Sequence, residues 1–143
     1  MIKSIRHTGI VVRNLEKVAN FYRALGFIDS NQAIEEGKFI DQVTGLKNTK
    51  LEWIKLKTPD GYLIELLQYH SHLENQEVTQ QRSNKLGVSH MAFTVDNIEK
   101  TCEIIKKMGG SIVNPAALSN DSKVKVAYCH DIEGALMEIV EVI

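Results

Sequence analysis

The fold of this chain is decided by a stretch that it carries twice, first as His7-Thr8-Gly9-Ile10-Val11-Val12-Arg13-Asn14-Leu15-Glu16-Lys17 and again as His90-Met91-Ala92-Phe93-Thr94-Val95-Asp96-Asn97-Ile98-Glu99-Lys100. Histidine, valine, asparagine, glutamate and lysine stand at identical offsets in the two copies. The register continues as far as Gly26 and Gly109. Self-similarity at a fixed period indicates that one supersecondary unit has been duplicated. The chain is therefore predicted to consist of two tandem modules of the same topology.

In each copy the pattern predicts a strand followed by a helix. Residues 4–12 alternate and are rich in β-branched side chains, as in a half-buried strand, and residues 88–95 repeat this pattern. Asn14 and Asn97 each have the chemistry of a helix N-cap, and each precedes an apolar helical stripe that ends at a glycine. The predicted helices are residues 15–25 and 97–108.

Each helix is followed by three more predicted strands, which makes each module a βαβββ unit. Pro59-Asp60-Gly61 forms the last turn of the first module, and Gly134 ends the matching turn of the second. The offset between the copies is 83 residues at the histidines but 73 at these glycines, so the second module is predicted to be shorter after its first helix. The extra residues 35–48 are predicted to form a loop or a short helical turn. The remaining predicted strands are residues 27–33, 50–57, 62–68, 111–114, 123–130 and 135–142.

The predicted fold is of the α+β class and is divided by a polar linker. Residues 71–86 are rich in glutamate, glutamine, asparagine, serine and lysine, as in a solvated linker. The first module is predicted to occupy residues 1–70 and the second residues 87–143. At 143 residues and 43% hydrophobic, the two modules together are large enough to form one domain with a hydrophobic core.

Charge and hydropathy exclude several kinds of partner. The 17 basic and 18 acidic residues are interspersed and sum to a formal charge of -1, which is not the pattern of a protein that binds nucleic acid or an anionic membrane. No membrane-spanning stretch and no secretory signal is visible, so a cytoplasmic protein is expected. Cys102 and Cys129 are too few for a metal knuckle or a disulfide framework and are expected to be reduced core residues.

Two carboxylates in apolar strands point to chemistry. Glu65 and Glu138 each stand four residues after a glycine, inside a strand with two apolar faces. A buried carboxylate without a partner is costly, so each needs a cation, a donor network or a raised pKa. His7 and His90 lie on strand faces that carry only small or medium neighbours. If the modules pair about a pseudo-twofold axis, two imidazoles and two carboxylates converge in a cleft suited to a divalent metal.

Structural roles are the alternative for each of these residues. An isolated histidine is more often a hydrogen-bonded core or surface residue, and an isolated strand glutamate often reaches solvent at a sheet edge. Repetition in both modules favours the site. His70 and His72 have no counterpart in the second module and are expected to face solvent, and His130 likewise lacks a counterpart. Trp53 fills the core or contacts a substrate, depending on the register of its strand.

The doubled pattern of His-x-x-φ-x-Val near the start of each half and Gly-x-x-x-Glu near its end resembles the vicinal oxygen chelate superfamily, also called the glyoxalase/bleomycin resistance/dioxygenase family. The resemblance covers nearly the whole chain. It implies paired βαβββ modules in a cupped, mostly antiparallel open sheet with helices on the outer face. It also implies one divalent metal ion (Zn, Ni, Co or Mn) held by His7, Glu65, His90 and Glu138. In many members this site is completed across a homodimer by exchange of modules.

Within the superfamily, the set of two histidines and two glutamates is similar to that of glyoxalase I, lactoylglutathione lyase. Residues 87–93 and 64–67 are also similar to methylmalonyl-CoA epimerases. Bacterial glyoxalase I usually keeps an arginine four places after its first histidine and an asparagine four places after its first glutamate, both serving glutathione. This chain has Val11 and Tyr69 there. The departure counts against glutathione as the substrate.

The resemblance and the residues together predict a metal-dependent lyase or isomerase that acts on a small carbonyl compound or thioester. A metal bound to two adjacent oxygens lowers the pKa of the neighbouring C–H and stabilises the enediolate. Glu138 or Glu65 can take that proton and return it, and the resemblance favours Glu138 as the base. The alternatives are a non-catalytic binding or drug-resistance module of the same fold and an extradiol-type Fe(II) dioxygenase.

Overall fold

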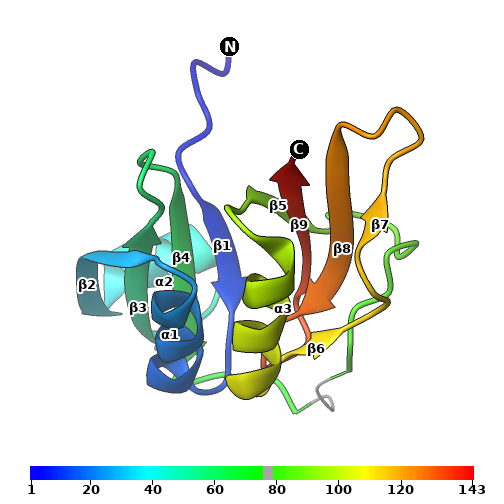
Figure 1. Ribbon diagram of the computed structural model, residues 1–143. Coiled ribbons are helices and arrows are strands. Elements are labelled where there is room, and N and C mark those ends of the chain that lie inside the picture. Colours follow the sequence, from blue (N-terminus) through cyan, green and yellow to red (C-terminus); the bar gives the residue numbers. More distant parts are fainter. Residues whose placement is uncertain (76–78) are drawn as a thin grey trace. The chain divides into compact units, whose positions relative to one another are not determined.

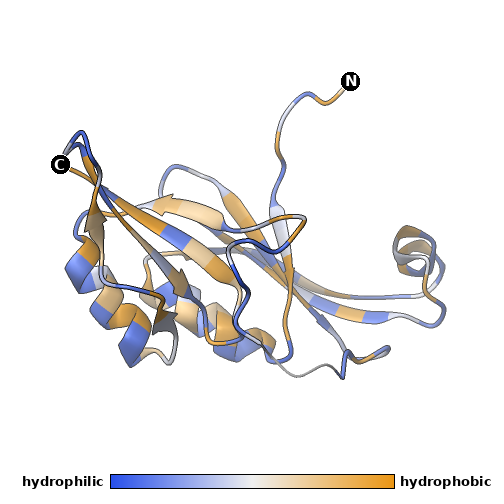
Figure 2. Ribbon diagram, turned by 90° about the vertical axis from the view of Figure 1, so that its right-hand side faces the viewer, coloured by the Kyte–Doolittle hydropathy of each residue, from blue (hydrophilic) through white to orange (hydrophobic). Residues whose placement is uncertain are grey.

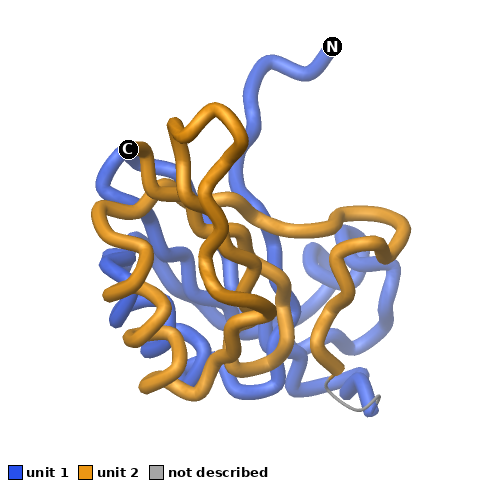
Figure 3. The backbone as a smooth tube through the Cα atoms, turned by 45° about the vertical axis from the view of Figure 1, so that its right-hand side comes forward, with its two compact units in different colours: residues 1–76 blue, residues 77–143 orange. Residues whose placement is uncertain are grey.

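The computed structural model describes residues 1–75 and 79–143 and divides the chain into two compact units (Figure 3). Unit 1 comprises residues 1–76 and unit 2 comprises residues 77–143. The linker predicted for residues 71–86 includes residues 76–78, which lie outside the described residues. The α+β class is confirmed, because each unit combines helix with a mixed, open sheet of its own (Figure 1).

Unit 1 is a βαβββ module with one additional helix. Its elements are β1 (Thr8–Val11), α1 (Leu15–Ala24), β2 (Ile28–Glu36), α2 (Lys38–Thr44), β3 (Lys50–Lys57) and β4 (Leu63–Tyr69). The sheet order is β1-β4-β3-β2, in which β1 and β4 run parallel and the other neighbours antiparallel. Helix α1 packs against β3 and β4, and its residues Val18 and Tyr22 are fully buried there.

Unit 2 repeats this topology with shorter strands. Its elements are β5 (Met91–Thr94), α3 (Ile98–Lys107), β6 (Ser111–Ile112), β7 (Ala117–Leu118), β8 (Val124–His130) and β9 (Leu136–Val142). The sheet order is β5-β9-β8-β6, with β5 and β9 parallel. Strands β6 and β7 pair with opposite ends of β8 and together replace the long strand β2 of unit 1.

The main differences from the predicted elements lie in the longer half of unit 1. The segment predicted as a loop or a short helical turn is the end of β2 followed by the two-turn helix α2. The described residues of unit 2 contain no counterpart of α2, which accounts for the difference in repeat offset. The first strands are shorter than predicted, because each pairs with its parallel neighbour over only four residues. Strand β7 was not predicted, since two residues are too few to show alternation.

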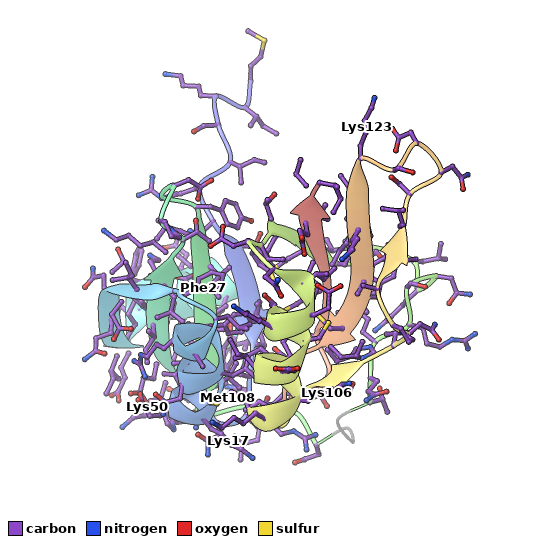
Figure 4. All side chains as sticks on the ribbon, in the orientation of Figure 1. Lys17, Phe27, Lys50, Lys106, Met108 and Lys123 are labelled. Atoms are coloured by element: carbon purple, nitrogen blue, oxygen red, sulfur yellow. The ribbon has the colours of Figure 1, made fainter. Side chains whose placement is uncertain are left out.

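The two longer helices begin at the predicted caps. The Asn14 side chain accepts a hydrogen bond from the backbone N–H of Lys17 at 3.0 Å, and Asn97 accepts one from Lys100 at 2.8 Å. The outer sides of both helices are charged, with Lys17 on α1 and Lys106 on α3 exposed (Figure 4). None of the helices in the described part of the chain is long and apolar enough to span a membrane.

Each sheet has a face that its helix covers and an opposite face that carries the predicted ligands. In β4, Ile64 and Leu66 are fully buried on the side of α1, and Glu65 between them projects from the opposite face. Strand β9 repeats this pattern around Glu138 on the side away from α3. The alternation of apolar and polar residues along the strands is visible in Figure 2.

Both cysteines are free, as the sequence predicted. Cys129 lies fully buried in β8, and burial raises the pKa of its thiol to about 12. Cys102 on α3 is half-buried, and burial raises the pKa of its thiol as well. Both side chains therefore remain protonated near neutral pH, and Cys129 behaves as a small core residue.

Candidate functional site

In unit 1 the structure brings His7 and Glu65 together. The parallel ladder between β1 and β4 pairs Gly9 with Glu65, and His7 lies on the same face two residues before Gly9. His7 Nε2 is 3.0 Å from Glu65 Oε2, and the two side chains are 27% and 13% exposed. The first predicted pair of imidazole and carboxylate is therefore formed, although its members lie far apart in the sequence.

In unit 2 the same ladder position brings His90 and Glu138 together. Ala92 on β5 pairs with Glu138 on β9, as Gly9 pairs with Glu65 in unit 1. His90 Nε2 is 3.5 Å from Glu138 Oε2, and the side chains are 27% and 24% exposed. This pair is more open than the first, because the distance is longer and the carboxylate is more accessible.

Lys55 holds the second oxygen of Glu65. The antiparallel ladder between β3 and β4 places Lys55 opposite Glu65, and Lys55 Nζ lies 3.0 Å from Glu65 Oε1. The same ammonium group lies 4.3 Å from the centre of the Trp53 ring, at the distance of a cation–π contact. Glu65 thus has an imidazole at one oxygen and an ammonium at the other, so its charge has two partners.

Tyr128 occupies the corresponding place in unit 2. It lies opposite Glu138 in the antiparallel ladder between β8 and β9, and its ring meets the His90 ring edge to face with centroids 5.0 Å apart. Burial raises the pKa of the Tyr128 phenol, and the charge of Glu138 and a hydrogen bond with it raise the pKa further. The neutral phenol therefore donates a hydrogen bond to Glu138 where unit 1 offers Glu65 an ammonium.

The spacing of the donor atoms fits a divalent ion. Two ligands that each lie about 2.1 Å from one ion are separated by about 3.0 Å at a right angle and about 3.4 Å at a tetrahedral angle. The separations of 3.0 Å in the His7 pair and 3.5 Å in the His90 pair are in this range. Lys55 lies at Glu65 Oε1, so Glu65 would offer an ion its other oxygen, Oε2.

The His7 ring has one nitrogen without a partner. Its Nδ1 is buried and makes no hydrogen bond within the described residues. The equivalent nitrogen of His90 lies 3.1 Å from Ser89 Oγ. An unpaired buried nitrogen is unfavourable. The contact of Nε2 with Glu65 therefore orients the His7 ring without a hydrogen bond at Nδ1.

Each unit by itself supplies half of the predicted ligand set. Within the described residues there is no group of three or more histidine, cysteine, aspartate or glutamate side chains placed to hold a metal ion. Unit 1 contributes His7 with Glu65, and unit 2 contributes His90 with Glu138. The convergence of all four at one ion stays a prediction.

The other histidines have roles outside these pairs. His70 is exposed, as predicted, and its Nε2 lies 2.7 Å from Glu52 Oε2 on the α1 side of the unit 1 sheet. His72 is also exposed, as predicted. His130 is only 5% exposed, and its Nε2 donates a hydrogen bond to the backbone carbonyl of Gln81 at 2.9 Å. His130 therefore has a structural role in unit 2.

Trp53 lies on the face of Glu65 and also fills a small core there. Ile40 of α2, Leu51 and Trp53 form a buried apolar cluster on this face, against which Tyr69 packs. The Trp53 indole N–H donates to Glu35 Oε1 at 3.0 Å, which fixes the ring beside Lys55. The predicted role of Trp53 as a core residue is confirmed, and its contact with a substrate stays a prediction.

Sequence reasoning missed Lys55 and Tyr128. The repeat contained a signal for them, because the offset of 73 residues that relates Glu65 to Glu138 also relates Lys55 to Tyr128. The two residues differ in type, so a comparison based on identical residues passes over them. Their importance follows from the strand register, which places each opposite its glutamate.

The chain matches one protein family over most of its length. The model of the Glyoxalase/Bleomycin resistance protein/Dioxygenase superfamily matches residues 4–139. Among curated proteins, none matches this chain.

Several solved structures are similar to this one. A glyoxalase family protein from Bacillus cereus is 25% identical with a TM-score of 0.92, over 100% of this chain and 96% of that chain. The fosfomycin resistance protein FosX from Listeria monocytogenes, complexed with Mn(II) and sulfate, is 16% identical with a TM-score of 0.62, over 100% and 95% of the two chains. A glyoxalase I mutant from Zea mays is 17% identical with a TM-score of 0.66, over 94% and 43%. The last two similarities show a shared fold only.

Proposed function

This chain belongs to the Glyoxalase/Bleomycin resistance protein/Dioxygenase superfamily, and we propose that it is a metal-dependent lyase or isomerase that removes a proton next to a chelated carbonyl group. The observation that carries the proposal is the repeated pair of imidazole and carboxylate, His7 with Glu65 and His90 with Glu138. Each pair occupies the same ladder position in its unit. A single pair is explained by an ordinary ion pair between a histidine and a glutamate. Its repetition at the same ladder position in both units is better explained by one ion that both pairs bind.

The four residues of these pairs would hold one divalent ion, with Zn, Ni, Co or Mn as the candidates. Imidazole nitrogens and carboxylate oxygens are common ligands of such ions. FosX, which has the same fold, is complexed with Mn(II), and this supports the choice. When bound, the ion would polarise the substrate carbonyl and stabilise the negative charge that develops as the neighbouring C–H loses its proton.

Glu138 is better suited than Glu65 to take the proton. Glu65 is held at both oxygens, by His7 and by Lys55, at 3.0 Å each. With an imidazole at one oxygen and an ammonium at the other, Glu65 has neither oxygen free to approach a substrate C–H. Glu138 is more exposed, at 24% against 13%, and has a longer contact with its histidine. We therefore assign proton transfer to Glu138 and a fixed ligand role to Glu65.

The fate of the proton on Glu138 determines the reaction. Return to the adjacent carbon gives an isomerisation of the glyoxalase I type, and return to the opposite face of the same carbon gives an epimerisation of the methylmalonyl-CoA type. Both need a small carbonyl compound or thioester with an acidic C–H. Val11 and Tyr69 stand where glutathione contacts are expected in bacterial glyoxalase I, so a substrate other than a glutathione adduct is proposed.

Metal binding is the first test. Titration of the purified chain with Mn(II), followed by electron paramagnetic resonance, is expected to show one bound ion per chain. His7→Ala and His90→Ala should each weaken binding by about 100-fold, because each removes one ligand. His70→Ala is the matched control, since His70 also contacts a glutamate but belongs to no repeated pair. A wild type that binds no divalent metal overturns the proposal.

Proton exchange is the second test. The metal-loaded protein is incubated in deuterated water with a panel of small carbonyl compounds and thioesters, and deuterium incorporation is followed by NMR. We expect exchange at the carbon next to the carbonyl and a loss of about 100-fold or more in Glu138→Gln. A metal-loaded protein that binds such compounds without exchanging a proton would instead support the non-catalytic binding module.

Mixed variants test whether the site is shared between two copies of the chain, as expected for a homodimer with exchanged modules. His7→Ala and His90→Ala are each inactive in the proposed scheme. If each site takes one pair from each copy, mixing the two variants restores some intact sites and some metal binding. If each site forms within one chain, mixing restores none. Sedimentation of the same samples measures the oligomeric state.

A further inference from the structure

We infer that Lys55 binds an anionic group of the substrate, so that the substrate carries a carboxylate beside the carbonyl group that the metal chelates. This inference rests on the proposed function and names the substrate class of the same site. It begins from a half-buried ammonium group that the repeat does not explain. Lys55 touches no predicted ligand except Glu65, yet it lies on the ligand-bearing face of unit 1.

The geometry puts Lys55 within reach of whatever Glu65 helps to hold. Lys55 Nζ is 3.0 Å from one oxygen of Glu65, and His7 Nε2 is 3.0 Å from the other. A ligand group at the His7 side of this carboxylate is therefore a neighbour of the ammonium group. The Lys55 side chain is 24% exposed, which leaves it accessible to a bound molecule.

Metal binding would change the charge balance around Lys55. In the metal-free chain, Glu65 neutralises the ammonium directly. A dication at the other oxygen would take up the negative charge of both predicted glutamate ligands and leave Lys55 without a full counter-ion. The residue opposite Lys55 on its other side is Asn31 of β2, which is neutral, and the carboxylate of Glu35, beside Trp53, accepts a hydrogen bond from the indole N–H. A half-buried ammonium in these surroundings favours an anion from the substrate.

The comparison with unit 2 shows that a cation is not required at this position for structural reasons. Tyr128 stands opposite Glu138 where Lys55 stands opposite Glu65, and the strand pairing is the same. A neutral phenol is thus compatible with a half-buried glutamate in this fold. A cation beside only one of the two glutamates suits an asymmetric substrate, with its anionic group near Glu65.

Lys55 is also held in place before any ligand arrives. Its ammonium lies 4.3 Å from the centre of the Trp53 ring. That ring is 9% exposed, packs in a buried cluster and donates a hydrogen bond to Glu35. A lysine ordered in this way loses less side-chain entropy on binding than a free surface lysine does.

Two isosteric ligands test this inference. Oxamate and oxamide each offer two adjacent oxygens to a metal ion, but only oxamate carries a negative charge. Their dissociation constants are measured by calorimetry on the full chain loaded with Mn(II). The wild type is expected to prefer oxamate to oxamide, partly because the positive charge of the bound Mn(II) attracts the anion. Lys55→Met keeps an unbranched side chain that is one atom shorter and removes its charge, so the part of the preference that it abolishes is due to the Lys55 ammonium group.

We expect Lys55→Met to reduce the preference for oxamate over oxamide by about tenfold or more, the effect of losing one charge-assisted hydrogen bond. Lys55→Arg restores a cation and should retain most of the preference. Lys57→Met is the matched control, because Lys57 lies on the same face of β3 but opposite the apolar Leu63. It should leave the preference unchanged. Urea unfolding of each variant verifies that it is folded.

The possible results separate the inference from the proposed function. If Lys55→Met binds Mn(II) and keeps the full preference for oxamate, the inference is wrong and the proposed function stands. If Lys55→Met binds Mn(II) more tightly than the wild type does and keeps the full preference for oxamate, the inference is also wrong, because Lys55 then only neutralises Glu65. If the wild type binds no Mn(II), the proposed function fails and the inference fails with it.

Discussion

The two units place a glutamate at equivalent points of their parallel ladders, but the residues around the two glutamates differ. In unit 1, Glu65 contacts His7 and Lys55, and both of its oxygens are occupied. In unit 2, Glu138 has His90 at a longer distance and a phenol opposite it on the next strand. The repeated backbone thus preserves the pair of imidazole and carboxylate, while the cross-strand neighbour differs between the two halves, which is the basis for the proposed division into a fixed ligand and a base.

The units also differ in how they close the turn that precedes the glutamate strand. In unit 2, the backbone N–H of Gln81 donates to the carbonyl of Gly134 at 2.9 Å, so the segment before β5 packs on this turn. A side chain at Gly134 would meet the backbone of Thr79. The turn at Gly61 in unit 1 has open space around it. Part of the segment predicted as a solvated linker is therefore bound to unit 2.

The largest expected effect separates the two glutamates. Glu138→Gln should slow proton exchange by about 100-fold or more at saturating Mn(II), because the base is lost. Glu65→Gln should chiefly weaken Mn(II) binding, and saturating metal should recover much of the exchange. Metal titration and deuterium incorporation by NMR are measured on both variants. Equal losses of exchange at saturating metal would contradict the division of roles.

The next effect separates the two turns. Gly134 has a φ of +87°, and an added Cβ would lie 2.6 Å from the Thr79 carbonyl oxygen, whereas Gly61 has a φ of +94° and nothing within 4 Å. Gly134→Ala is expected to cost about 3 kcal/mol, from strain and overpacking, and Gly61→Ala about 1 kcal/mol, from strain alone. Urea unfolding measures both. Similar losses of unfolding free energy in the two variants would show that the backbone at Thr79 moves aside at little cost.

A smaller effect separates the two helix starts. Gln68 Oε1 accepts a hydrogen bond from the backbone N–H of Leu15 at 2.8 Å, and Glu141 Oε2 accepts one from that of Ile98 at 2.7 Å. Only the carboxylate gains from the positive end of the helix dipole. Glu141→Gln should cost about 0.5 kcal/mol, and Gln68→Glu should gain less than this at low salt, because Glu52 lies opposite it on β3. An effect that persists in 1 M salt would exclude this electrostatic origin.

The smallest effect concerns helix α2, which has no equivalent in the part of unit 2 that the structure describes. Backbone N–H groups, first that of Thr49 and then that of Asn48, donate to Asp41 and lower the pKa of its carboxyl from its ordinary value. The stabilisation is therefore present above the unfolded pKa and is lost as the pH falls through the lower folded pKa. Asp41→Asn should lower the urea midpoint slightly at pH 7 and less at pH 3. An equal difference at both pH values would contradict this origin.

Much of the fold follows from local patterns. The repeat, the α+β class, both asparagine caps and the limits of β3 were predicted correctly, because alternation and capping act over a few neighbouring residues. Helix α2 was predicted only as a loop or a short helical turn, because its local sequence lacks a clear helix signal. It begins after Gly37 without a side-chain cap and is anchored by Ile40 in the cluster with Leu51 and Trp53. That anchor exists only after the strands have paired.

For the candidate site, the sequence by itself determined which residues are unusual: a histidine and a strand glutamate that recur in both halves. Only the tertiary structure decided that each histidine meets its own glutamate, because the parallel ladders join strands that are distant in the sequence. It also decided that Lys55 and Tyr128 face these glutamates. Cross-strand register depends on pairing over the whole sheet, and no short stretch of sequence contains that information.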